Sequence, residues 1–159
     1  MTDLQPDTRI HNPVGVKVVA AVDVPVNAST AWALVGDFGG FQRFIDALET
    51  TVVTGHGPGS VRHKTFKDGN FAIEQLNRYD ADAKLMTWSL IHTSLPVGNL
   101  WAAMEVSPLT EGGSRATWTI QAEPALTGPL QSLEAFEGFL QGFADSAMAK
   151  AKVMLSRHL

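Results

Sequence analysis

The sequence contains no cysteine in its 159 residues. Disulfides, thiolate catalysis and cysteine-ligated metals are therefore excluded, and the redox state of the compartment stays open. The net charge is only -4, and the 12 basic residues are spread along the chain. A protein that binds a polyanion gathers its basic residues on one surface. We therefore expect no nucleic acid partner.

Long hydrophobic runs are missing as well. No segment reaches the ~18 uninterrupted apolar residues of a membrane span, and the N-terminal MTDLQPDTRI lacks the apolar stretch of a signal peptide. These absences predict that the chain has no membrane span and, by default, a cytoplasmic location.

Motifs for metal and nucleotide chemistry are also absent. The sequence has no HxH, no HExxH and no carboxylate cluster at ligand spacing, and GDFGG at 36–40 does not continue into a phosphate-binding loop. No Ser/His/Asp order accompanies a nucleophile elbow. We therefore expect neither a metal nor another cofactor.

The composition is that of one globular domain. Apolar residues make up 45% and charged residues 18% of the chain, which argues against disorder. A chain of this length can bury about two-thirds of the surface that its unfolded form exposes. Residues 1–12 are polar and interrupted by proline, so we expect a loose tail there and a single domain over 13–159.

The first half of the domain begins with a strand and two short helical pieces. Val14 to Pro25 is rich in β-branched residues, which favours a strand. A short helix is expected over 29–38, capped by Asn27 or Ser29 and stopped by the glycine pair at 39–40. A second apolar-periodic piece follows at 41–48.

Six further segments have strand character, and glycine, proline and aspartate fill the short connections between them. Consecutive hairpins of this kind predict an antiparallel meander. The six expected strands are 49–55, 60–66, 70–79, 85–93, 99–106 and 114–123.

The period changes beyond PALTGP at 124–129, where apolar residues recur at three and four residues. This pattern predicts one long helix whose apolar stripe holds Leu133, Phe136, Leu140, Phe143, Ala147, Ala151 and Met154. The order of elements predicts an α+β domain in which a curved antiparallel sheet packs around that helix. Small residues in or beside the stripe leave either a close approach to the sheet or a cavity, and they are Gly138, Gly142, Ala144 and Ala147.

Four stretches carry a family resemblance: PVNASTAWALVGDF, the GSVR after a glycine-rich turn, the E-x-L of strand 70–79, and SLPVGN before the penultimate strand. With them the chain resembles the polyketide cyclase/dehydrase and lipid transport family, within the START-like (SRPBCC) superfamily of the birch pollen allergen. The resemblance implies a helix-grip fold, with seven antiparallel strands wrapped around the C-terminal helix. It also implies an internal cavity for an apolar or aromatic molecule.

The plant abscisic acid receptors belong to the same superfamily, and their layout can be laid over residues 59–102 with almost no gaps. This overlay implies a gate at FKDGN with Asp68 and Gly69, and a latch at TSLPVGN with Pro96 and Val97. Gln42 stands where those receptors carry a lysine for the ligand carboxylate, and Leu100 and Ala102 replace a tyrosine and a serine. The resemblance therefore does not support an abscisic acid-like ligand.

Glu74 is an unusual residue for the middle of a strand, and alternation alone cannot choose its face because both faces are mixed. The resemblance implies that Glu74 and Arg62 point into the cavity. A carboxylate buried without a partner costs several kcal/mol, so we expect the two to pair. The pair is either a structural ion pair or a polar anchor and acid/base group for a ligand.

Lys64 shares a face with Arg62 and is either an amine nucleophile, a second cation or an ordinary exposed lysine. His63 has the opposite parity and is expected outside. The overlay implies that Trp88 and Leu90 point inward. His92 shares their parity, so we expect it at the cavity mouth, where it could move protons near neutral pH.

The tryptophans bear on the ligand. Trp88 and Trp118 have inward parity, Trp32 is expected in the core, and Trp101 is out of parity and could face a partner. An aromatic or polycyclic ligand is expected if the cavity is lined by Trp88, Trp118, Phe66 and Phe143. The full set of expected ligand contacts is Arg62, Phe66, Glu74, Trp88, Leu90, Leu100, Trp118, Ile120 and Phe143.

The leading hypothesis is a protein, monomeric or homodimeric, that binds an aromatic, polyketide-like or lipid-like molecule. The alternative is a cofactor-free cyclase, dehydratase or aromatase in which Glu74, with Lys64 or His92, moves protons. A third possibility is a module whose closed gate binds a partner protein. One fold serves all three classes, so the sequence does not decide between them.

Overall fold

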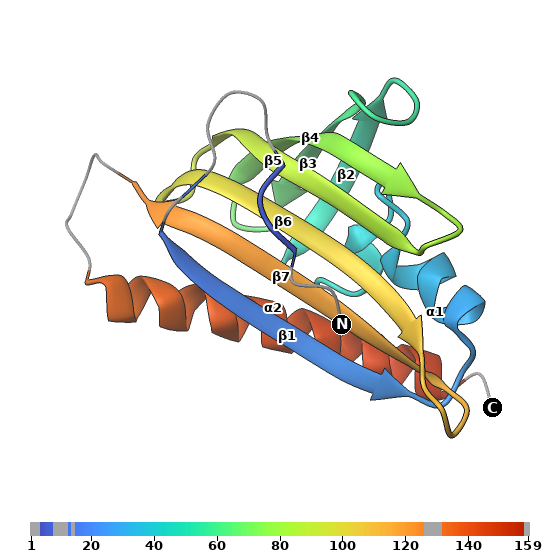
Figure 1. The fold of residues 1–159 in the computed structure, drawn as a ribbon. Coiled ribbons are helices and arrows are strands. Elements are labelled where there is room, and N and C mark those ends of the chain that lie inside the picture. The colour runs from blue at the N-terminus through green and yellow to red at the C-terminus, as the bar shows by residue number, and fades with distance from the viewer. Residues whose placement is uncertain (1–3, 8–12, 14, 126–131, 158–159) are drawn as a thin grey trace.

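Seven strands form one antiparallel sheet that curves around a long C-terminal helix (Figure 1). The computed structural model describes residues 4–7, 13, 15–125 and 132–157. The strand order in the sheet is β1-β7-β6-β5-β4-β3-β2, so β1 and β2 are its two edges. The bounds are β1 Val16–Val24, β2 Leu48–Thr54, β3 Val61–Phe66, β4 Phe71–Asp80, β5 Leu85–Thr93, β6 Val97–Pro108 and β7 Ser114–Pro124.

The fold predicted from the sequence is confirmed, and most strand ends fall within two residues of their expected positions. The first strand was expected from Val14, which lies outside the described residues. β6 begins at Val97 rather than at residue 99, because the chain already pairs with β7 through Val97 and Pro124.

The first short helix, α1 (Ala28–Val35), begins where a side chain can cap it: Oδ1 of Asn27 accepts a hydrogen bond from the Thr30 amide at 2.8 Å. It ends at Gly36, earlier than expected. A Cβ atom at position 36 would lie 2.3 Å from the Trp32 ring, so the close packing of this ring requires glycine there. The second helical piece is a single 3-10 turn, η1 (Phe41–Arg43), and is shorter than the expected 41–48.

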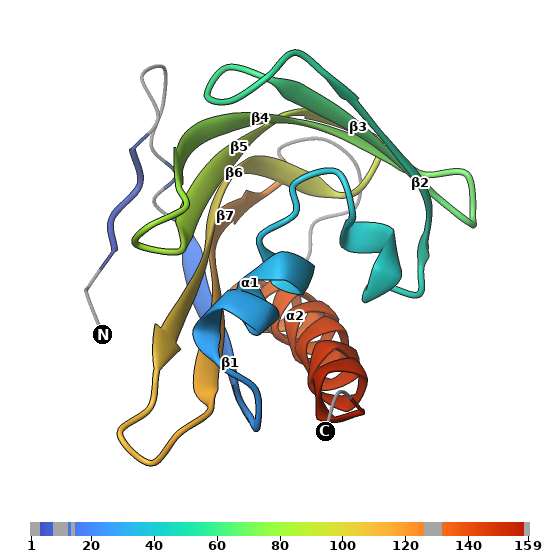
Figure 2. The same cartoon turned by 90° about the vertical axis from the view of Figure 1, so that its right-hand side faces the viewer.

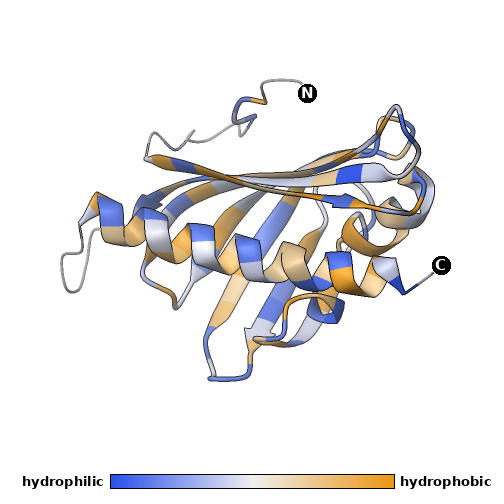
Figure 3. Cartoon of the chain, turned by 90° about the horizontal axis from the view of Figure 1, so that it is seen from below, coloured by the Kyte–Doolittle hydropathy of each residue, from blue (hydrophilic) through white to orange (hydrophobic). Residues whose placement is uncertain are grey.

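The long helix α2 (Leu133–Ser156) starts at Ser132, whose hydroxyl accepts from the Ala135 amide at 3.0 Å. Figure 3 shows hydrophobic and hydrophilic residues interspersed along it. Its buried side includes Phe136, Leu140 and Ala147, as predicted. The prediction that the buried stripe begins at Leu133 was wrong. This side chain is 59% exposed, because the helix extends beyond the edge of the core there.

The small residues of α2 divide into two groups. Ala144 and Ala147 are buried, whereas Gly138 and Gly142 are exposed and have open space where a Cβ would stand. The two glycines therefore do not let the helix approach the sheet; with Phe143 and Ala147 they line a separate hollow that opens to solvent.

The core lies between the concave face of the sheet and α2, and α1 packs against α2 and strands β6 and β7 (Figure 2). Its centre is aromatic. Phe41 from η1 meets the rings of Trp88 and Trp118 edge to face, at centroid distances of 5.4 and 5.9 Å. Such pairs stabilise a core beyond the area that they bury.

Residues 4–7 lie on the outer face of the sheet, away from α2 (Figure 2). Leu4 packs against a small cluster that includes Leu85 and Trp101. Oδ1 of Asp7 accepts a hydrogen bond from Trp101 Nε1 at 2.6 Å, and Oδ2 accepts one from the Thr87 hydroxyl at 2.8 Å. Trp101 is thus on the outer side, as its parity indicated, but it is fully buried by the chain's own N-terminal segment.

Candidate functional site

A pocket of about 60 Å³ lies between the concave face of the sheet and α2. Strands β3 to β7 and the helix all contribute to its wall. The predicted contacts that line it are Phe66, Glu74, Trp88, Leu90, Leu100, Trp118, Ile120 and Phe143, and Lys64 joins them. Of the ionisable side chains in the described part of the chain, Lys64 and Glu74 line this pocket.

Strand alternation explains how the polar residues come together. Arg62, Lys64 and Phe66 alternate with outward residues on β3 and are all buried. On β4 the inward residues include Ala72 and Glu74. The antiparallel register pairs Arg62 with Glu74 and Lys64 with Ala72, so three charged side chains share one small area of the inner face.

Glu74 points inward and is 4% exposed. Its Oε1 accepts a hydrogen bond from Arg62 Nε at 2.8 Å and lies 2.9 Å from Lys64 Nζ. One carboxylate oxygen therefore holds two cations. The expected pairing with Arg62 is present, and the second partner places Lys64 inside the protein.

Arg62 lies behind the pocket rather than on its wall. It has no exposed surface, and its guanidinium carbon is 4.2 Å from the ring centres of Phe38 and Phe41 and 4.8 Å from that of Trp88. Its Nη1 donates to the Phe38 carbonyl oxygen at 2.8 Å, while Nη2 is buried without a hydrogen-bond acceptor in the described part of the chain. Arg62 therefore joins the sheet to the segment after α1.

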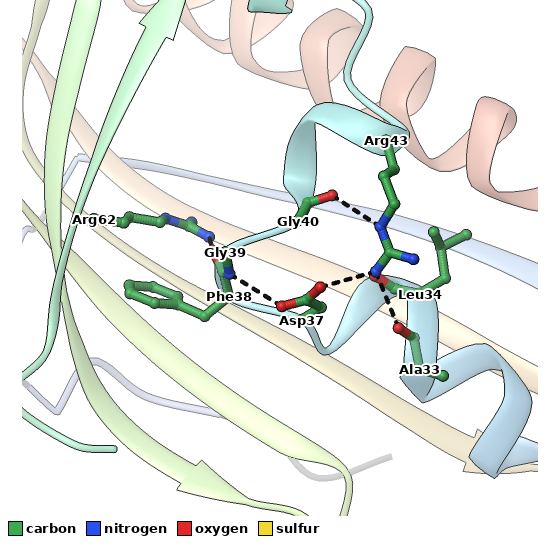
Figure 4. Close-up of polar contacts among 8 residues, drawn as sticks. All are labelled: Ala33, Leu34, Asp37, Phe38, Gly39, Gly40, Arg43 and Arg62. Atoms are coloured by element: carbon green, nitrogen blue, oxygen red, sulfur yellow. Dashed lines mark hydrogen bonds and ion pairs between the residues drawn. The ribbon is translucent and has the colours of Figure 1, made fainter. Parts of the chain in front are cut away.

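The other side of that segment is held by a second arginine (Figure 4). Nη2 of Arg43 is 3.0 Å from Oδ2 of Asp37 and donates to the Ala33 carbonyl oxygen at 3.1 Å. The Gly39 amide donates to Oδ1 of Asp37 at 3.2 Å. Residues 37–40 are thus fastened from inside by Arg62 and from outside by Arg43.

The three buried charges shift one another's pKa values. Burial alone raises the pKa of Glu74, but the charges and hydrogen bonds of Lys64 and Arg62 outweigh it and hold that pKa below its usual value. Burial lowers the pKa of Lys64, and the nearby Arg62 charge lowers it further, against the attraction of Glu74. The carboxylate is therefore ionised at neutral pH, and the lysine is the member of the group whose proton is most easily lost.

The inward position expected for His92 is wrong. Glu74 pairs with Leu90 and Ile73 pairs with His92, so Ile91 is an additional residue in β5, and the strand bulges there. The bulge turns His92 outward, where it is exposed and contacts the Phe71 ring at a centroid distance of 5.3 Å. His63, expected outside, is exposed.

The two loops assigned as gate and latch touch each other. The Ser94 hydroxyl donates to Oδ1 of Asn70 and accepts from the Phe71 amide, both at 2.9 Å. Asp68 is exposed and caps the turn by accepting from the Asn70 amide at 2.9 Å.

Within these loops Gly69 has a φ of 92°, a conformation that favours glycine, and Pro96 is exposed. Val97 is 9% exposed and lines the pocket. Val97 thus brings the latch loop to the pocket wall, whereas Asp68, Gly69 and Pro96 do not line the pocket, and the gating role of both loops stays a prediction.

The sequence profile of the family described as polyketide cyclase/dehydrase and lipid transport matches residues 15–153. The chain belongs to this family. The sequence matches no curated protein.

Solved structures with the fold of this family come from several bacteria. XoxI from Bacillus cereus is 20% identical with a TM-score of 0.78, and the match covers 88% of this chain and 95% of that one. An uncharacterised protein from Bacillus thuringiensis is 19% identical with a TM-score of 0.77, covering 88% and 98%. A protein from Thermobifida fusca is 21% identical with a TM-score of 0.74, covering 89% and 93%. These likenesses concern the fold alone.

Further lining residues that the expected set of ligand contacts did not include are Ala72, Thr93, Leu95, Ala102, Phe139 and Leu140. The bulge at Ile91 shifts the alternation of β5 by one residue, so that Thr93 points inward. No pattern in the sequence predicts this bulge. Phe139 is 44% exposed and lies one helical turn before Phe143 of the predicted stripe, so this four-residue spacing was the available signal.

Two larger hollows open to solvent elsewhere. One of about 760 Å³ is lined by residues that include Trp32, His56 and Tyr79, and one of about 510 Å³ lies between Phe44 and Gly142. Neither contains the Lys64 and Glu74 pair. The smaller inner pocket is therefore the better candidate site, because it combines apolar walls with convergent charged groups.

Among the described residues no three histidines or carboxylates gather as metal ligands. No helix in the described ranges has the length and hydrophobicity to cross a membrane.

Proposed function

We propose that this protein binds a small apolar or aromatic molecule in the pocket between the sheet and α2. The observation that carries the proposal is the wall itself: rings of Trp88, Trp118 and Phe143 surround a space that also receives Lys64 and Glu74. Apolar walls with few polar groups are typical of small-molecule sites. Membership of a family described by polyketide chemistry and lipid transport supports the same class of ligand.

The pocket must widen to hold such a ligand. Its volume of about 60 Å³ is far below the roughly 300 to 1,000 Å³ of most ligand sites. The boundaries best suited to move are the loop at Leu95 and the partly exposed ring of Phe139. We therefore expect binding to be slower than a diffusion-limited encounter, since opening precedes or accompanies it.

A second candidate function is cofactor-free catalysis of a cyclisation or dehydration. The contact of 2.9 Å between Lys64 Nζ and Glu74 Oε1, on the pocket wall, favours it. A carboxylate and an amine so placed could remove and return a proton on a bound polyketide-like substrate. His92 has no part in this candidate, because it lies on the outer face.

The first test is native mass spectrometry of freshly purified protein against its denatured mass. A retained compound of intact mass would support binding and reveal its chemistry. The direct test is calorimetric titration with aromatic acids, amides and polyketides of increasing size. Ala102→Leu should abolish binding, because Ala102 lines the pocket and is 1% exposed. Ala149→Leu, on the exposed side of α2, should bind like the wild type.

Catalysis is tested separately, by following substrate conversion in the wild type and in Lys64→Met. Conversion that is lost while binding persists would establish the enzyme. If compounds of the panel bind and none is converted, the result supports a binding protein and contradicts the catalytic function. Binding that is unaffected by Ala102→Leu would rule out this pocket for both functions.

A further inference from the structure

The inner face of the sheet carries an unbalanced charge. Among the described residues the buried ionisable side chains are Arg62, Lys64 and Glu74. With all three ionised they sum to one net positive charge. A buried charge without a counter-charge is costly in an apolar surrounding, so this excess needs an explanation.

The charge of Arg62 is not the excess positive charge that a ligand in the pocket would contact. It pairs with Glu74, donates to the Phe38 carbonyl oxygen and lies against three aromatic rings. It does not line the pocket. Its charge is thus matched by Glu74, by the attraction of the nearby Asp37 carboxylate and by the faces of those rings.

Lys64 does line the pocket. Its ammonium group has three N–H donors, and in the described part of the chain its one ionic partner is Glu74 Oε1, already shared with Arg62. Side chains that reach the pocket from β5, β6, β7 and α2 are all uncharged. The excess positive charge therefore lies at Lys64, on the wall of a space with aromatic sides.

We propose that the ligand of this pocket carries one anionic oxygen group of the carboxylate type, which binds against the Lys64 ammonium. This inference rests on the proposed function. The anion would complete the donors of Lys64 and bring the buried charge to zero, while the apolar body of the ligand lies among Trp88, Trp118 and Phe143. Gln42, which stands where the abscisic acid receptors carry their lysine, does not line the pocket; here the cation comes from β3.

Shape-matched acids and amides test the proposal. Benzoate is compared with benzamide and 2-naphthoate with 2-naphthamide, by calorimetry at pH 7. The wild type should bind each acid at least about tenfold more tightly than its amide, a difference of about 1.4 kcal/mol. Lys64→Met should remove this preference, and Lys64→Arg should retain it. Lys152→Met, on the exposed side of α2, should behave like the wild type.

Each outcome separates the two proposals. If amides bind as tightly as acids in the wild type, or if the acid preference survives in Lys64→Met, the anion site is refuted while pocket binding stands. If neither member of either pair binds, and the larger compounds of the titration panel also fail, the proposed function falls and the anion site with it. Should Lys64→Met fail to fold, the wild-type acid and amide comparison together with Lys64→Arg still decides.

Discussion

The Lys64 ammonium nitrogen lies 2.9 Å from Oε1 of Glu74, the same oxygen that accepts the hydrogen bond of Arg62. Neighbouring strands β3 and β4 bring these side chains onto the inner face, where both Lys64 and Glu74 are 4% exposed. A surface lysine would add little to such a pair, but here water cannot screen the charges. Stability and pH response are therefore expected to depend on these three residues, and so is the ligand choice that we propose.

Removing the Glu74 charge is expected to destabilise the fold strongly. Glu74→Gln leaves Arg62 and Lys64 buried together without a counter-charge, and breaking a buried ion pair in this way costs about 3–5 kcal/mol. Urea denaturation followed by far-UV circular dichroism measures the loss. Asp23→Asn breaks the exposed pair with Arg115 and should cost much less, because that pair is in water.

A variant without any of the three charges should be stable again. Arg62→Met, Lys64→Met and Glu74→Leu together replace an ionic group by apolar side chains, a change that is neutral or stabilising in comparable sites. Should the triple variant be as unstable as Glu74→Gln, packing of Arg62 against the rings of Phe38 and Phe41 matters more than charge balance.

The free energy of unfolding should fall in acid because of Glu74. Its pKa in the folded protein is below the usual 4.5, so the carboxylate contributes stability above about pH 4.5 and loses it as the pH falls through the lower folded value. Lys64 acts in the opposite range: burial lowers its pKa below 10.5, so its cost to the fold diminishes as the pH rises toward 10.5. Urea midpoints measured from pH 3 to pH 10 should vary less in the triple variant than in the wild type. If the midpoints of both proteins change equally with pH, Glu74 and Lys64 are not the origin of the pH dependence.

Loosening the contact between the two loops should speed ligand exchange. Ser94→Ala removes the hydroxyl that bonds both Asn70 and the Phe71 amide. Both association and dissociation of 2-naphthoate should accelerate by a similar factor, so that the Kd changes little. Stopped-flow kinetics measures the rates, and Ser107→Ala at an exposed position of β6 is the control. Unchanged rates would mean that the loops do not limit entry.

The N-terminal segment should protect Trp101. Asp7→Ala removes the acceptor of Trp101 Nε1 and of the Thr87 hydroxyl, at a cost of about 1–3 kcal/mol. Because Trp101 is fully buried under this segment, its fluorescence should become more accessible to acrylamide. Asp7→Asn keeps an acceptor oxygen, so its acrylamide quenching should lie between that of the wild type and that of Asp7→Ala. Identical quenching in all three proteins would mean that other residues cover the ring.

Much of the pocket could be predicted from the sequence because strand alternation is a local property. The receptor overlay and strand parity together assigned Trp88, Leu90, Trp118 and Ile120 to the inner face, and all four line the pocket. Turn residues and helical periodicity likewise determined the number and order of the elements. Alternation and helical periodicity depend only on residues close in the sequence, so they can be recognised without knowing which strand pairs with which.

Only the tertiary structure decided what depends on segments far apart in the chain. Parity alone left Glu74 undecided, and the resemblance implied its inward position. The structure places Glu74 on the inner face, opposite Arg62 of β3 and within reach of Lys64, which pairs with Ala72. The bulge at Ile91, which turns His92 outward, arises in the pairing of β4 with β5. Period-two alternation fixes relative directions within one strand, whereas the choice of face, the bulge and the shared carboxylate are settled by which strands meet and what they bury.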